Sequence, residues 1–331
     1  MYKKTGYGFI YYFGIGNVVN IFSKRPKGII LAYHRVSPLS TVNALLKDLC
    51  VDPSSFDKQM MYLKKNYNVI SLEQALEYVD SASNKLDNSI VITFDDAYAD
   101  NYEYAYPILR KHSLAATVFA STSFIDDKRA FWWDMLVDIL EGTQKETVNF
   151  SFLGKNHKFK LNKEKQRAFY AIAHLFKRST PEEQKTLTGI LRGAFALDEK
   201  AVLSCCLSWE QIREMSNHNI TFGSHTHSHI SLSSVLNGQL QEELVKSKEI
   251  LELNIRRKVT AFAYPFGEQD DFNKKSIALV SQAGYRCALT MLQGPVYCGD
   301  NAFTLRRVGV GGNDTVSVFK LKTMGLVPLL K

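Results

Sequence analysis

A buried strand pattern that ends in two acids sets the strongest limit on how this chain can fold. Ser89–Phe94 (SIVITF) is apolar and rich in β-branched residues, and Asp95 and Asp96 follow it directly. Such a run is typical of a strand buried on both faces in a parallel sheet. Because side chains at the carboxyl end of such strands face the ligand crevice, we expect both acids to line a site. The alternative is a turn that caps a helix beginning near Tyr98.

A histidine cluster follows a second predicted strand. Asn219–Gly223 (NITFG) predicts a short strand, and the string SHTHSH follows it. His225 and His229 are four residues apart, a spacing that suits one metal ion, and with one carboxylate they leave positions open for water and substrate. His227 has the wrong spacing for joint ligation, so we interpret it as exposed or as a neighbour of the ligands. Together with the acid pair, this cluster predicts metal-assisted hydrolysis.

Strand and helix patterns alternate along most of the chain, which is typical of an α/β barrel. The predicted strands are Gly28–Val36, Ile90–Phe94, Ala115–Ala120, Asn219–Gly223, Val259–Tyr264, Tyr285–Thr290 and Leu305–Val310. The predicted helices are Phe56–Lys65, Leu72–Val79, Tyr102–Lys111, Trp209–Ser216, Gln239–Leu253, Lys274–Ala283 and Thr315–Met324.

Residues 125–206 form an insertion between two of these strand and helix units. Val148–Leu161 alternates around a glycine and predicts a hairpin, and a helix and a capping box follow it. Trp132 and Trp133 precede the hairpin. Their rings either stack on sugar or pin the insertion to the barrel.

Three strings in combination resemble the first three motifs of the polysaccharide deacetylases, also called carbohydrate esterase family four or the NodB-homology domain. The strings are TFDDAYADNYEYAYPILRKHSLAATVFAST, FGSHTHSHISLS and FAYPFG. The resemblance implies an α/β fold, a distorted (β/α) barrel of the NodB-homology type. Residues 28–124 and 207–331 would form this barrel, and residues 125–206 an inserted lobe of a hairpin and helices.

The resemblance also implies roles for single residues. Asp95 would be the general base, and Asp96, His225 and His229 would bind a divalent metal, most commonly zinc. The backbone N–H of Phe266, in the YPFG string, would help to hold the oxyanion. A metal polarises the acetyl carbonyl and lowers the pKa of bound water toward about 7. The expected activity is hydrolysis of acetyl groups, mainly N-acetyl, from a cell-surface polysaccharide or its glycan precursor.

The source of the general acid departs from the common pattern. Many members supply it from a late histidine, but no histidine follows His229 in this chain. The run Gly28–Val36 (GIILAYHRV) resembles the YH motif of the subgroup that deacetylates poly-N-acetylglucosamine, in which an early histidine takes that place. We therefore assign His34 as the general acid. The alternative is a histidine packed at a strand end.

Two further positions depart from the pattern. Ala97 stands where many members have glycine, and it would be strained at a positive φ. Ala263 stands where many have an arginine that steadies the base. We predict that Arg307, in the string LRRVGV, supplies this guanidinium to Asp95. The alternative is an arginine on a solvated strand edge.

Two functions remain open from the sequence: the deacetylase, and a catalytically impaired glycan-binding or exopolysaccharide-assembly protein on the same barrel. The acids and histidines favour the first, whereas Ala97, Ala263 and the missing late histidine favour the second.

The resemblance implies an acetylated glycan as the partner, and composition bears on other classes of partner. A net charge of +8 favours anionic surfaces or acidic glycans. No helix-turn-helix, RNP or zinc-finger pattern occurs, so we predict no nucleic-acid partner. Five cysteines, an odd number, argue against a disulfide framework and favour a reducing compartment. The sequence does not indicate an oligomeric state.

Residues 1–27 are predicted to be an amphipathic or membrane-proximal arm. The arm has a basic start and an apolar middle but no small-residue cleavage site. Its apolar stretch is shorter than the roughly 20 residues that span a bilayer. We predict peripheral membrane contact through residues 1–25 and a location in the cytoplasm or at the cytoplasmic membrane face. The alternative is an exported protein anchored by this segment.

Overall fold

The computed structural model describes residues 27–81, 83–128, 130–196 and 205–326. Apart from Lys27, the predicted membrane-proximal arm lies outside the described residues, so its membrane contact stays a prediction. Within the described ranges, no helix combines the length and the apolar composition that a membrane crossing requires.

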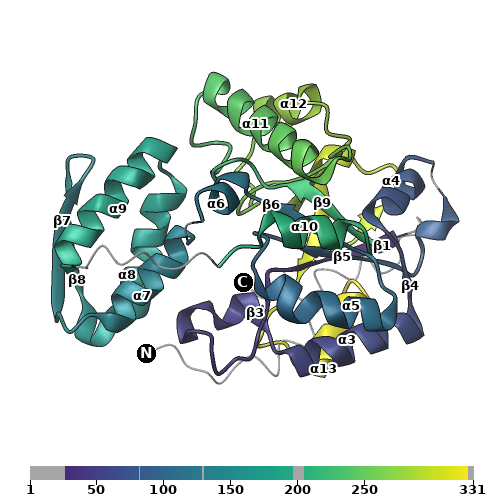
Figure 1. Cartoon of the computed structure of the whole chain (residues 1–331), viewed down its shortest axis with the longest axis horizontal. Helices are drawn as coiled ribbons and strands as arrows, with labels where there is room; N and C mark the ends of the chain where they lie inside the picture. The colour runs from purple at the N-terminus through teal and green to yellow at the C-terminus, as the bar shows by residue number, and fades with distance from the viewer. Residues whose placement is uncertain (1–26, 82, 129, 197–204, 327–331) are drawn as a thin grey trace.

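Seven parallel strands close into a barrel (Figure 1), which confirms the predicted fold class. Around the barrel, the strands are β1 (Lys27–Tyr33), β13 (Leu305–Gly309), β11 (Cys287–Gln293), β10 (Ala261–Ala263), β9 (Ile220–Ser224), β6 (Ala116–Ala120) and β5 (Ser89–Phe94). Pairing of β1 with β5 closes the ring. The short strands β4 (Asn68–Val69) and β12 (Val296–Tyr297) extend it, and β2 (Arg35–Val36) pairs with β3 (Cys50–Val51).

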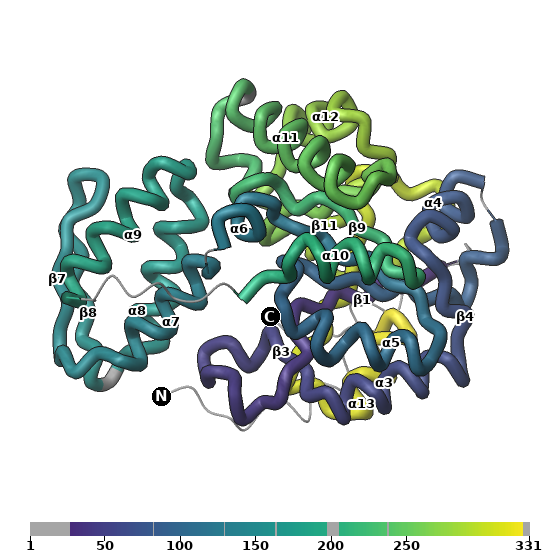
Figure 2. The backbone as a smooth tube through the Cα atoms, in the orientation of Figure 1, coloured from purple at the N-terminus to yellow at the C-terminus, as the bar shows by residue number. Residues whose placement is uncertain are grey.

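Helices surround the barrel, with α11 and α12 on one side and α3, α5 and α13 on the opposite side (Figure 2). These helices are α3 (Pro53–Asn66), α4 (Leu72–Asp80), α5 (Tyr106–His112), α10 (Trp209–Ser216), α11 (Asn237–Ile255), α12 (Lys274–Gln282) and α13 (Val316–Thr323). The prediction of one regular helix over Tyr102–Lys111 is wrong, because a π-helical turn at Asn101–Ala105 precedes α5. Pro107 has no N–H for the carbonyl four residues earlier, which interrupts the regular pattern.

Alternate residues of each barrel strand point into the barrel, as the two-residue period of a strand requires. On β1 and β5, Ile30 and Val91 pack together inside, whereas their neighbours pack outward against helices. Phe119 on β6 fills the interior so closely that a Cβ on Gly223 would lie 2.4 Å from its ring. The same alternation decides which residues at the strand ends point inward.

The insertion forms a lobe beside the barrel, at the left of Figure 1. It contains α7 (Trp132–Gly142), the hairpin of β7 (Thr147–Phe152) and β8 (Lys155–Lys160), α8 (Leu161–Lys177) and α9 (Pro181–Phe195). The predicted hairpin is confirmed, but its turn lies one residue earlier, at Leu153 and Gly154. Both have positive φ, at 49° and 72°, as a tight two-residue hairpin turn requires.

Candidate active site

Inward-pointing residues at the carboxyl ends of the strands converge on one point. Because Ile30 and Val91 point inward, the two-residue period also turns His34 and Asp95 inward. The strands are in register, since the Asp95 N–H donates to the Tyr33 carbonyl at 2.9 Å. The carboxyl end of the barrel therefore collects the residues that the sequence singled out.

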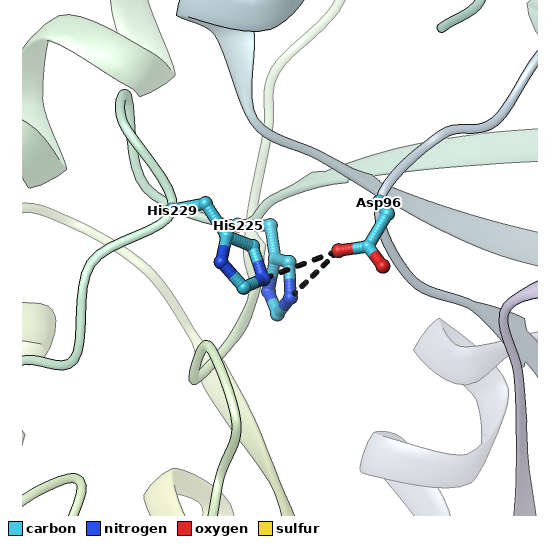
Figure 3. Close-up of side chains that lie close together, drawn as sticks. All are labelled: Asp96, His225 and His229. Carbon is cyan, nitrogen blue, oxygen red and sulfur yellow. Dashed lines mark ion pairs between the residues drawn. The ribbon is translucent and has the colours of Figure 1, made fainter. Parts of the chain in front are cut away.

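Asp96, His225 and His229 form a compact, buried triad (Figure 3). One ligand atom from each residue lies within 4.8 Å of the others. The Nε2 atoms of His225 and His229 lie 3.6 and 3.2 Å from Oδ1 of Asp96. These are the side chains that could hold a metal ion.

The hydrogen bonds of the triad fit a cation. Nδ1 of His225 lies 2.8 Å from the carbonyl oxygen of Ala263, which can only accept, so Nδ1 carries the proton and Nε2 presents a lone pair toward Asp96. Burial lowers the pKa of His225 to about 4, which keeps its ring neutral at physiological pH. Among the described residues, Asp96 Oδ1 is buried without a hydrogen-bond donor. A buried carboxylate oxygen without a donor is costly unless a cation binds it.

Asp95 is held by a buried arginine. Arg307 is 0% exposed, and its NH1 and NH2 groups donate to the two carboxylate oxygens of Asp95 at 2.7 Å each. Its Nε donates to the Thr290 carbonyl at 2.9 Å. Burial raises the pKa of Asp95, but the charge and hydrogen bonds of Arg307, together with nearby His225 and His34, outweigh burial and hold this pKa well below its usual range. Arg307 therefore lies inside the barrel on the acid, not on a solvated strand edge.

His34 directly follows β1, at the same end of the barrel as both acids. Its positive form would lower the pKa of Asp95 and of Asp96, which places its ring within electrostatic reach of both. Asn101 Nδ2 donates to its backbone carbonyl at 2.9 Å and fixes the start of the loop. The half-buried ring of His34 lines an open cavity of about 280 Å³ together with Asp48 and Met291. Solvent and a bound molecule can therefore reach His34.

Phe266 lies at the centre of a tight turn next to the triad. Its φ is 61°, and the Gly267 N–H donates to the Pro265 carbonyl across it at 2.7 Å. The Phe266 ring meets the His229 ring edge to face, with 5.0 Å between centroids. Among the described residues, no backbone acceptor takes the Phe266 N–H, so this donor is available to a bound molecule.

The sequence did not predict that side chains of the inserted lobe would line one side of the site. The Trp133 ring lies edge to face on His229 at 4.6 Å, and its Nε1 donates to the Tyr98 hydroxyl at 2.5 Å. That hydroxyl donates to Asp134 at 3.0 Å, and burial raises the pKa of Asp134 to about 6 despite the nearby charge of Arg35. No motif spacing signals this network, because it joins the insertion to the barrel.

The two tryptophans pack inward instead of facing solvent. Trp132 is 9% exposed and stacks on Phe176 at 4.7 Å and 2°, while Trp133 is 6% exposed. Both rings are packed and do not form an open sugar platform: Trp132 packs on Phe176 within the lobe, and Trp133 joins the lobe to the barrel at Tyr98 and His229. His227, as expected, lies apart from the triad, with Nδ1 2.8 Å from the Thr122 hydroxyl.

Residues 82–288 match the polysaccharide deacetylase family, which covers more than half of the chain. The chain belongs to the polysaccharide deacetylase family. This deacetylase is 22% identical over 291 residues to the protein YxkH of Bacillus subtilis, covering 88% of this chain and 74% of the relative. It is 29% identical over 123 residues to the poly-β-1,6-N-acetyl-D-glucosamine N-deacetylase of Staphylococcus aureus, covering 34% of this chain and 42% of that protein.

Solved structures share the fold of this deacetylase. The Streptococcus pyogenes deacetylase PplD, in complex with acetate, has a TM-score of 0.61 at 21% identity, covering 91% of this chain and 99% of that one. IcaB from Ammonifex degensii has a TM-score of 0.57 at 17% identity, covering 92% and 98%.

Proposed function

We propose that this chain is a metal-dependent deacetylase that removes N-acetyl groups from a polysaccharide or its glycan precursor. One observation carries the proposal. A buried carboxylate oxygen of Asp96 lies 3.6 and 3.2 Å from the Nε2 atoms of His225 and His229, directly beside an aspartate that Arg307 keeps ionised. This pairing of a cation site with an ionised acid is what metal-assisted hydrolysis needs.

The metal would be held by Asp96, His225 and His229, and zinc is the proposed ion because two histidines and one carboxylate are a common catalytic zinc set. When bound, a divalent metal polarises the acetyl carbonyl and makes water more acidic. The Ala263 carbonyl orients the His225 ring from behind.

Different residues of the chain then accept and donate the protons. Asp95 accepts a hydrogen bond from the attacking water and takes its proton; each carboxylate oxygen has a second lone pair besides the one that Arg307 occupies. The Phe266 N–H donates to the acetyl oxygen as it becomes negative. His34 then donates a proton to the nitrogen, the carbon–nitrogen bond breaks, and acetate and a free amine leave.

The proposed substrate is a polymer of N-acetylglucosamine. This choice is supported by the Staphylococcus aureus relative, whose name gives it a poly-β-1,6-N-acetyl-D-glucosamine substrate. For the location, we propose the cytoplasm or the cytoplasmic membrane face, and the support is the odd number of cysteines, five, which argues against a disulfide framework.

The test is to measure bound metal and then acetate release in wild type and in Asp95→Asn. The substrates are β-1,6-linked N-acetylglucosamine oligomers, with an O-acetylated glycan beside them. We expect about one metal per chain in both proteins, acetate from the N-acetylated oligomer with wild type, and a loss of at least 100-fold with Asp95→Asn. Bound metal without acetate release from any acetylated glycan would favour the glycan-binding alternative.

A further inference from the structure

The Phe266 turn is strained and depends on its surroundings. A three-residue turn with a positive φ at its centre is rare for a residue other than glycine. Such a conformation persists only where neighbouring contacts hold it. Gly267, which follows at φ 64°, has no room for a Cβ, because it would lie 2.7 Å from the Met291 N atom. The chain therefore packs tightly on one flank of the turn.

A lysine of the inserted lobe contacts this turn. Lys177, the last residue of α8, places Nζ 5.1 Å from the centre of the Phe266 ring, a distance that suits a cation–π contact. The same ring meets the imidazole of His229. Phe266 is therefore in contact with both a proposed metal ligand and the lobe.

Lys177 is itself held by a buried acid. Its Nζ lies 3.0 Å from Oδ2 of Asp271, whose side chain is 2% exposed, and 3.4 Å from Glu268. Asp271 also accepts from the Glu268 N–H at 2.9 Å and from the Ser231 hydroxyl at 3.0 Å. This carboxylate thus joins the loop after Phe266, the segment after the histidine string, and the lobe.

The helix that carries Lys177 is anchored. The neighbouring Phe176 is 0% exposed and stacks on Trp132, the first residue of α7. Lys177 is only 25% exposed. Its ammonium group is therefore presented from a packed element and not from a free loop.

We propose that Lys177 is a positioning residue that holds the Phe266 turn so that its N–H points at the reacting acetyl oxygen. This inference rests on the proposed function. It assigns a catalytic contribution to the inserted lobe, through an ion pair with Asp271 and a contact with the Phe266 ring. Preorganised donors of this kind are effective only when they are held in place before reaction.

The test compares Lys177→Met, which keeps the length of the side chain but removes the charge, with Lys177→Arg, which keeps the charge. The matched control is Arg167→Met on the same helix, because the Arg167 side chain is 79% exposed and pairs with Glu164, also on α8. We expect Lys177→Met to lower kcat about tenfold, with KM and metal content within about twofold of wild type. Lys177→Arg should recover most of this loss, and Arg167→Met should change nothing.

Hydrogen–deuterium exchange gives a second readout that does not need activity. The amides of Gly267 and Glu268 are hydrogen-bonded within the turn and the loop. In Lys177→Met we expect both to exchange about tenfold faster, with the hairpin of the lobe unchanged.

Unchanged exchange of these amides, or faster exchange with an unchanged kcat, overturns the proposal. If wild type releases no acetate, the proposed function fails, and exchange alone then decides whether Lys177 holds the turn.

Discussion

The Arg307–Asp95 pair permits the sharpest test of the site. In Arg307→Met the buried carboxylate loses both of its 2.7 Å partners, while the volume of the side chain is largely kept. Two unit charges about 4 Å apart interact by about 4 kcal/mol at an effective dielectric of about 20. This value agrees with the cost of about 3–5 kcal/mol for removing one partner of a buried ion pair. We therefore expect the free energy of unfolding to fall by about 4 kcal/mol near pH 8.

The loss should depend on pH in a stated direction. In wild type the pKa of Asp95 is held low, so the pair stabilises the fold above the unfolded value of about 4 and is lost only at lower pH. In Arg307→Met, burial is left to raise the pKa of Asp95, so keeping the carboxylate charged becomes more costly as the pH rises. The difference between the two proteins should therefore shrink from pH 8 to pH 4.

The assay is urea unfolding at several pH values. Metal is removed from both proteins beforehand, so that release of metal in acid does not contribute to the difference in unfolding free energy between them. Arg306→Met is the matched control, because Arg306 is the exposed neighbour on the same strand. A loss within about 1 kcal/mol of this control at pH 8, or a difference that does not shrink toward pH 4, would refute the reasoning. Acetate release by Arg307→Met should fall as well, with the metal content of the reconstituted protein unchanged.

Three further predictions concern the triad, the acid and the lobe. Asp96→Ala should abolish metal binding, and a chelator should lower the Tm of wild type but not of this variant; an equal shift in both proteins would argue against Asp96 as a ligand. His34→Gln should lower kcat by about 10²–10⁴-fold with metal content unchanged, and unaltered kcat would remove the assignment. Trp132→Ala should lower the free energy of unfolding by about 3–5 kcal/mol through loss of the stack on Phe176, with the KM for glycan unchanged. Weaker glycan binding at equal stability would instead support the interpretation of Trp132 as a platform for sugar rings.

Local strand patterns made much of the site predictable. The acids directly follow an apolar run, and the two-residue period of that run sets which acid enters the barrel. The same period, counted from Leu305, turns Arg307 inward, so its contact with Asp95 follows from strand alternation once β13 lies in the barrel. These relations depend on short stretches of sequence and on the rule that parallel strands end at one edge.

Contacts between distant segments could not be predicted. Lys177 reaches Asp271 across 94 positions of sequence, and Trp133 reaches His229 from the start of the insertion. Neither pair has a fixed spacing or a motif, because both depend on how the lobe packs on the barrel. Ala263 stands where many family members have an arginine that steadies the base. In this chain the Ala263 carbonyl orients His225, and Arg307 supplies the guanidinium to Asp95 instead.

Backbone strain explains how two adjacent acids take different tasks. In a regular strand Asp96 would point away from the barrel interior, but its φ of 70° and the φ of 55° at Ala97 turn the chain so that its carboxylate meets the histidines. His229 and Phe266 also have positive φ, at 53° and 61°. Each such residue costs about 1–2 kcal/mol, which is a large share of the net stability of a fold. Two of the three triad residues, Asp96 and His229, therefore depend on a left-handed backbone for their placement.

Ala97 is the departure from the glycine pattern that most favoured a loss of chemistry. Its positive φ costs about 1–2 kcal/mol relative to glycine. However, its methyl group is fully buried, at 0% exposed, and burial of one such group contributes about 0.8 kcal/mol. Burial offsets part of the strain and leaves a cost of about 0.2–1.2 kcal/mol, so alanine can hold the same turn as glycine at a modest cost to the fold. Because the turn still delivers Asp96 to the histidines, Ala97 is compatible with an intact metal site and does not argue for an impaired enzyme.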